Sequence, residues 1–123
     1  MKAGNQQVGA RLRVVLGSGI AVGPGKADIL EGIRQTGSIA AAGRRMGMSY
    51  KRAWLLVESM NAGFKAALVE TSRGGSTRGG ATLTATGELV LDCYRRMEVL
   101  TASAIAEEMD KLQRALRDVA EEK

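Results

Sequence analysis

Apolar residues alternate with polar ones near the start of the chain, and this pattern predicts a small β-hairpin. Residues 11–16 have the period of two that is typical of a half-buried strand. The apolar residues that share one side of this segment are Leu12, Val14 and Leu16. Glycines at 17 and 19 predict a turn, and the short apolar run 20–22 predicts a returning strand.

After the hairpin the apolar spacing changes to that of a helix. Pro24 suits the first turn of a helix, where a backbone N–H has no partner in any case. The apolar stripe of this predicted helix consists of Ile29, Leu30 and Ile33. We expect the helix to end near Thr36, because Gly37 is a natural C-terminal stop.

The segment 38–57 predicts two further helices that pack closely around a tight turn. Ser38 and Ser49 are suitable N-caps, and Gly47 fits the turn between the two helices. Small residues occupy the positions where the helices would touch, namely Ala42, Gly43 and Ala53. This arrangement is typical of a helix-turn-helix whose second helix enters the major groove of DNA.

The charges around that turn favour a nucleic-acid partner. Arg44, Arg45, Lys51 and Arg52 surround it with no acid between them. Lys51 and Arg52 fall in the first turn of the second helix, where the helix dipole favours acids, and a capping box would place Glu or Gln at the position of Arg52. A phosphate or a base edge would supply the missing counter-charge. The alternative is a solvated helical hairpin. Cations at the end of the first helix, such as Arg44, are ordinary dipole complements and weaker evidence.

One flank of the second helix adds further candidates for DNA contact. Tyr50, Lys51 and Trp54 have the spacing of neighbours on a helix surface. A Trp at this spacing is as often a packing anchor as a nucleic-acid contact. The candidate DNA-binding residues of this part of the chain are Arg44, Ser49, Tyr50, Lys51, Arg52 and Trp54.

A glycine-rich basic loop between two short strands predicts the wing of a winged helix. Residues 68–71 read as a strand and residues 82–84 as its return. The loop between them contains Arg73 and Arg78 and four glycines. The alternative is a solvated linker, against which the flanking strands argue.

From Gly87 the sequence predicts one long helix to the end, because no Pro or Gly follows this residue. It carries two apolar stripes, which are Leu89, Cys93, Met97 and Leu100, then Ile105, Met109, Leu112, Leu116 and Val119. The second stripe is a short heptad seam. The spacing of Cys93 predicts a buried position. A second copy of the chain is the simplest cover for both stripes, and the alternative is a helix that folds back on the domain.

These elements predict a mostly α fold with a small β component. We expect a winged helix-turn-helix domain over 11–86 and a dimerisation helix over 87–123. The net charge of the chain is +5, and residues 1–82 have 12 Lys/Arg against 4 Asp/Glu, for a net charge of +8. Residues 83–123 have 6 against 9, for −3. The basic charge therefore belongs to the helix-turn-helix part, as expected for a protein with a polyanionic partner.

Composition and failed motifs exclude several other classes of function. The chain has no His and one Cys, which excludes a Ser-His-Asp triad, a Cys/His zinc site and an internal disulfide, and fits a reducing cytoplasm. No apolar run is long enough to span a membrane. The glycines of 17–26 miss the phosphate-loop pattern at Ile20 and Ala27. Asp28 and Glu31 are acids in the first turns of a helix, where the dipole alone favours them, so we expect no enzyme and no cofactor.

The segments GPGKADILEGI at 23–33, TGSIAAAGRRMGMSYKRAW at 36–54, LVET at 68–71 and ATLTATG at 81–87 resemble the DNA-binding domain of ModE-type molybdate-responsive regulators. That domain is similar to the winged helix of LysR-type regulators. The resemblance implies a homodimer on a two-fold, inverted-repeat operator of double-stranded DNA. It also implies that Ser49, Tyr50, Lys51, Arg52 and Trp54 face the major groove, and that Arg73 and Arg78 face the backbone or minor groove.

The chain departs from that family where the molybdate-binding domains would begin, so we expect it to bind no molybdate. The expected function is sequence-specific transcription regulation by a cytoplasmic homodimer. The alternative is a helical adaptor that binds another regulator and touches DNA only incidentally.

Overall fold

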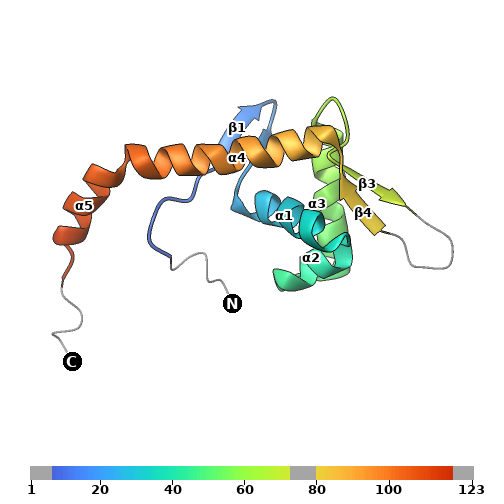
Figure 1. Ribbon diagram of the computed structural model, residues 1–123, viewed down its shortest axis with the longest axis horizontal. Coiled ribbons are helices and arrows are strands. Elements are labelled where there is room, and N and C mark those ends of the chain that lie inside the picture. Colours follow the sequence, from blue (N-terminus) through green and yellow to red (C-terminus); the bar gives the residue numbers. More distant parts are fainter. Residues whose placement is uncertain (1–6, 73–79, 118–123) are drawn as a thin grey trace.

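The structure is a computed structural model that describes residues 7–72 and 80–117. It is mostly helical with two short antiparallel hairpins, which confirms the predicted fold class (Figure 1). In chain order the elements are β1 (Val14–Gly17), β2 (Ile20–Val22), α1 (Pro24–Thr36), α2 (Ile39–Arg45), α3 (Tyr50–Gly63), β3 (Val69–Ser72), β4 (Gly80–Leu83), α4 (Ala85–Ala104) and α5 (Ala106–Arg114). In Figure 1, α4 runs as a long bar along one side of the domain, next to α1.

The N-terminal hairpin pairs β1 with β2 through a tight turn. Val14 lies opposite Val22, and Ser18 adopts a left-handed φ of 49° that closes the turn together with the glycines beside it. Leu12 and Val14 pack against the core as predicted. Leu16 is exposed, which corrects the predicted half-buried face, because β1 has no further element to pack against at its end.

The core lies where α1, α2 and α3 meet, and small residues set how closely these helices approach. The side chains of Ile29, Leu30 and Ile33 are fully buried, as their stripe predicts. Any Cβ added at Gly32 would lie 2.8 Å from the Cβ of Ala42, and one added at Gly43 would lie 2.9 Å from that of Ala53. Larger side chains at these two positions would push the helices apart. The predicted close contacts are therefore confirmed.

The second hairpin, β3–β4, is attached to the end of α3 by a single amide side chain. The Asn61 Oδ1 accepts hydrogen bonds from the backbone N–H groups of Leu68, at 2.8 Å, and Val69, at 3.1 Å. The Asn61 Nδ2 donates to the carbonyl of Val69 at 3.1 Å. Val69 pairs with Leu83 across the hairpin. These bonds fix the direction in which the hairpin leaves the domain.

The face that α4 buries is not the one that the sequence analysis singled out. Gly87, Leu91 and Tyr94 are buried against the domain. The stripe that contains Leu89 and Cys93 faces outward, so the predicted burial of Cys93 is wrong. The periodicity was real, but it marks an apolar face that the described residues leave uncovered.

The predicted single C-terminal helix is interrupted at Ile105. This residue has φ −99° and ψ 3°, and it ends α4 and precedes α5. Leu112 and Leu116 of the predicted seam are exposed, and Val119 lies outside the described residues. Among the described residues, no helix combines the length and the apolar character needed to cross a membrane.

Candidate nucleic-acid interface

The turn between α2 and α3 is held by its backbone and by one serine. Gly47 has a φ of 72°, and the N–H of Met48 donates to the carbonyl of Gly43 at 3.0 Å. The Ser49 hydroxyl accepts from the backbone N–H of Arg52 at 3.1 Å, which confirms the predicted N-cap. The start of α3 is therefore fixed relative to α2, as a recognition helix requires.

The outer face of α3 presents most of the predicted contact residues to solvent. Ala53, Val57 and Met60 face the core. On the other side, Tyr50 is 56% exposed and Trp54 is 39% exposed. Lys51 and Arg52 are exposed as well. The structure thus brings these four side chains to one end of one helix, and it leaves Trp54 outside the buried core.

Sequence reasoning missed Leu55, which lies on the same outer face. Its side chain is 53% exposed, one helical turn after Lys51. An apolar side chain at the centre of an otherwise polar helix face suits contact with a thymine methyl group. The signal was present in the sequence, because Leu55 falls outside the apolar stripe of α3.

The basic side chains around the turn have no acidic partner within the described part of the chain. Arg44, Lys51 and Arg52 are exposed and form no ion pair there. The first turn of α3 contains no acid, so these cations add to the positive end of the helix dipole. Arg45 donates to the side-chain oxygen of Gln35 at 2.8 Å, a neutral acceptor. This surface therefore retains its positive charge.

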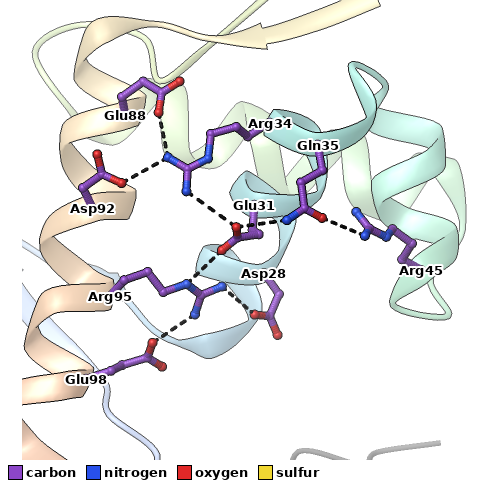
Figure 2. A network of polar contacts seen from close by, with 9 residues as sticks. All are labelled: Asp28, Glu31, Arg34, Gln35, Arg45, Glu88, Asp92, Arg95 and Glu98. Atoms are coloured by element: carbon purple, nitrogen blue, oxygen red, sulfur yellow. Dashed lines mark hydrogen bonds and ion pairs between the residues drawn. The ribbon is translucent and has the colours of Figure 1, made fainter.

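The acids of α1 and α4 are instead collected between these two helices, around two arginines (Figure 2). Arg34 contacts Glu31, Glu88 and Asp92. Arg95 contacts Asp28, Glu31 and Glu98, and its three nitrogen–oxygen distances are 3.0 to 3.1 Å. The two carboxylates of α1 that could have been considered for catalysis, those of Asp28 and Glu31, are therefore engaged in ion pairs. These ion pairs also neutralise both acids of α1.

Hydrogen bonds to carboxylates raise the pKa of both arginines. Those to Glu88 and Asp92 raise the pKa of Arg34 above its ordinary value. Burial lowers the pKa of Arg95. The hydrogen bonds to Asp28, Glu98 and Glu31 together raise it by more than burial lowers it, so the net shift of the pKa is upward. Both arginines therefore remain charged, and both remain committed to this network.

The predicted wing residues Arg73 and Arg78 lie outside the described residues. The strands β3 and β4 on either side of them are described, and they form the antiparallel pair expected at the base of a wing.

Comparison with curated proteins reveals relatives that the chain matches over only part of their length. No family model matches the chain. It is 38% identical to the molybdenum-pterin-binding protein MopB of Rhodobacter capsulatus over 97 residues, which are 79% of this chain and 36% of that protein. It is 36% identical to the transcriptional regulator ModE of Yersinia pestis over 81 residues, 66% of this chain and 31% of that protein. The chain thus spans about a third of the length of these relatives.

Comparison with solved structures identifies the fold. The chain superposes on a CbnR DNA-binding domain, solved as a complex with DNA, with a TM-score of 0.51 and 24% identity, covering 75% of this chain and 95% of that one. It superposes on the full-length LysG of Corynebacterium glutamicum with a TM-score of 0.53 and 24% identity, covering 71% of this chain and 28% of LysG. The fold of the chain is that of a winged-helix DNA-binding domain.

Proposed function

We propose that this chain binds a defined duplex DNA site and regulates transcription from it. The chain is homologous to the N-terminal region of the ModE-type regulators, and it has the fold of LysR-type DNA-binding domains. The observation that carries the proposal is the start of α3. Lys51 and Arg52 project there from a rigid turn, against their own helix dipole, without an acid to neutralise them among the described residues. A DNA phosphate or base edge supplies what they lack.

Each exposed residue of the turn has a role that fits its chemistry. Lys51 and Arg52 bind phosphates or guanine edges, and Arg44 binds a phosphate. Ser49 and Tyr50 add shorter hydrogen bonds to the backbone or to base edges. Trp54 packs against the DNA surface from the same flank as Tyr50. We extend the proposal to Arg73 and Arg78, for which we expect contacts with phosphate or the minor groove.

The same proposal includes a cytoplasmic homodimer formed through α4. The outward stripe of that helix is apolar over much of its length, with Leu89 61% exposed and Leu100 52% exposed. A second copy of the chain would cover it, and the two recognition helices would then meet an inverted repeat on the DNA. That these 123 residues hold no molybdate site stays a prediction, which calorimetric titration with molybdate checks.

Competition binding tests the proposal against the adaptor alternative. Genomic fragments selected by the full chain supply a candidate operator, and random duplex DNA is the competitor. A regulator prefers the operator by a factor of about 10³ or more, whereas an adaptor shows no such gap. Lys51→Ala with Arg52→Ala should abolish most of the preference for the operator over random DNA, because each lost base contact should cost about 1–3 kcal/mol of binding free energy.

A charge-matched control isolates position from net charge. Lys111 and Arg114 lie on α5, are well exposed, and pair only locally with Glu108 and Asp110. Their double substitution by Ala removes the same charge as the α3 variant and should leave the specificity ratio unchanged. Equal losses in the two variants, both well folded, would contradict the assignment of α3 as the recognition helix.

A further inference from the structure

A second basic surface lies beside the outer face of α3, and the N-terminal hairpin and α1 contribute to it together with α3. On the flank of α3 that carries Arg52, Leu55 and Ser59, a groove of about 640 Å³ separates this helix from the N-terminal hairpin and from the first turn of α1. We call it the hairpin groove. Its walls include Arg13, Lys26 and Arg52 and, among the residues that line it, no Asp or Glu.

The three cations come from three separate parts of the sequence. Arg13 directly precedes β1, Lys26 lies in the first turn of α1, and Arg52 lies in the first turn of α3. The Nζ of Lys26 donates to the carbonyl of Ala21 at 2.8 Å, which holds the ammonium group at the wall of the groove. Over residues 7–72 and 80–117, none of the three forms an ion pair.

The first turn of α1 adds positive charge to the same place. Its N-cap is Gly23, so no side chain accepts from the free N–H groups of that turn, and the turn contains no acid. Lys26 therefore opposes its helix dipole, as Lys51 and Arg52 do on α3. Two helices of one small domain thus begin with uncompensated cations beside the same groove.

From these contacts we infer that the hairpin groove holds the sugar–phosphate backbone of one DNA strand, the strand at the edge of the major groove that α3 enters. Arg13 and Lys26 contact its phosphates, and Arg52 joins this contact to the reading face of α3. Charge complementarity and continuity with α3 single out this occupant. The inference rests on the proposed function and adds the N-terminal hairpin to the interface.

Salt dependence of DNA binding by the full-length chain tests the assignment. The variants are Arg13→Ala and Lys26→Met, the second of which keeps the aliphatic stem that packs at the groove wall. Each lost phosphate contact should make the fall of log K with log salt less steep by about 0.9. It should also weaken binding to the operator and to random DNA by the same factor. Lys26→Arg should restore the slope. Lys111→Ala, which removes an exposed cation on α5, is the charge-matched control and should leave the slope unchanged.

Comparison with the α3 variant separates this inference from the proposed function. If Lys51→Ala with Arg52→Ala loses the operator while Arg13→Ala and Lys26→Met keep the parental slope, the groove assignment is wrong and the proposed function stands. If none of these variants binds DNA more weakly than the parent, both the groove assignment and the proposed function are wrong. A changed sequence preference in Arg13→Ala at an unchanged slope also overturns the groove assignment, since phosphate contacts carry no sequence information.

The position of the contact can be checked on the DNA itself. Neutral methylphosphonates replace single phosphates along one half-site, and binding is measured for the parent and for Arg13→Ala. At the phosphate that Arg13 contacts, the two changes should not add, because either one removes the same interaction. Additive losses at every phosphate of the half-site, on a variant whose thermal unfolding matches the parent, would overturn the contact.

Discussion

The Nε of Arg95 on α4 donates to the Oε1 of Glu31 on α1 at 3.0 Å, and this bond is the first link of a chain of contacts that reaches α2 (Figure 2). The other carboxylate oxygen of Glu31 accepts from Gln35 at 3.2 Å. The oxygen of Gln35 accepts from Arg45 at 2.8 Å. The long helix is therefore tied to the helix-turn-helix by polar contacts in addition to apolar packing.

Removing the charge of Arg95 should loosen α4 from α1. Arg95→Met leaves Asp28, Glu31 and Glu98 near one another without their shared cation. Because these groups are partly exposed, we expect a loss of only about 1–2 kcal/mol in the free energy of unfolding. Urea unfolding at low salt measures the loss, which should shrink at high salt as the charges are screened.

The neighbouring residue provides the control for that experiment. Arg96 is exposed on the same helix and has no ion pair within the described part of the chain. Arg96→Met should therefore unfold like the parent chain. A loss in Arg95→Met that is equal at low and high salt would assign the effect to the lost hydrogen bonds rather than to the screened charges.

Local signals were sufficient to predict much of the fold. Gly37 ends α1 with a φ of 74°, and Ser38 and Ser49 cap α2 and α3 as their positions in the sequence indicate. The solvent-exposed face of α3 was predictable for the same reason, because the apolar stripe through Ala53 and Val57 defines the opposite side of the helix.

The packing of α4 could not be predicted, because it depends on contacts between residues far apart in the sequence. The hydroxyl of Tyr94 donates to the carbonyl of Leu12, 82 residues earlier, at 2.6 Å. Gly87 lets the helix approach the backbone of Leu68. Periodicity shows that α4 has an apolar stripe, but it cannot say whether that stripe faces its own domain or another chain. The hairpin groove was missed for the same reason.

Replacing Tyr94 by Phe should change how stability depends on pH. Burial raises the pKa of the Tyr94 phenol above its ordinary value of 10.0, and the charge of Glu98 acts in the same direction. The unfolded chain therefore releases this proton first, so the contribution of Tyr94 is complete below about pH 10 and declines as the pH rises towards the folded pKa. Denaturant unfolding between about pH 8 and pH 11 should show this decline in the parent and less of it in Tyr94→Phe.

The same variant loses a buried hydrogen bond. At neutral pH we expect Tyr94→Phe to cost about 1–2 kcal/mol, because the carbonyl of Leu12 is left without its donor. Tyr50→Phe is the matched control, since Tyr50 is exposed on α3 and should have little effect on stability. Parallel pH profiles for the parent and Tyr94→Phe would show that the phenol ionises alike in the folded and unfolded chains.

Gly87 should tolerate no side chain. Its ideal Cβ would lie 2.1 Å from the carbonyl oxygen of Leu68, which is a backbone atom and cannot rotate away. Gly87→Ala should therefore destabilise the chain by about 1–3 kcal/mol, although Ala normally favours a helix. Gly25→Ala is the matched control, because nothing lies within 4 Å of its added Cβ. It should be neutral or stabilising by up to about 1 kcal/mol, and similar thermal unfolding of the two variants would contradict the close approach.

The outward face of α4 should determine the oligomeric state. Leu89→Glu with Leu100→Glu places two charges on a stripe that is exposed in the described part of the chain, so the fold should survive while a dimer through this face separates. Light scattering should then give a monomer at concentrations where the parent is a dimer. Affinity for an inverted-repeat operator should fall far more than affinity for a half-site, because the two half-sites no longer act together.

A second pair of variants separates α4 from the helix that follows it. Leu16→Glu changes an exposed apolar residue on β1 and should leave the dimer intact. Truncation after Ala104 removes α5, and it should weaken the dimer without abolishing it if α4 provides the main contact. A monomeric parent chain at micromolar concentration would reject the dimer and, with it, the inverted-repeat operator. A dimer that survives Leu89→Glu with Leu100→Glu but not the truncation would move the interface from α4 to the predicted seam after Ile105.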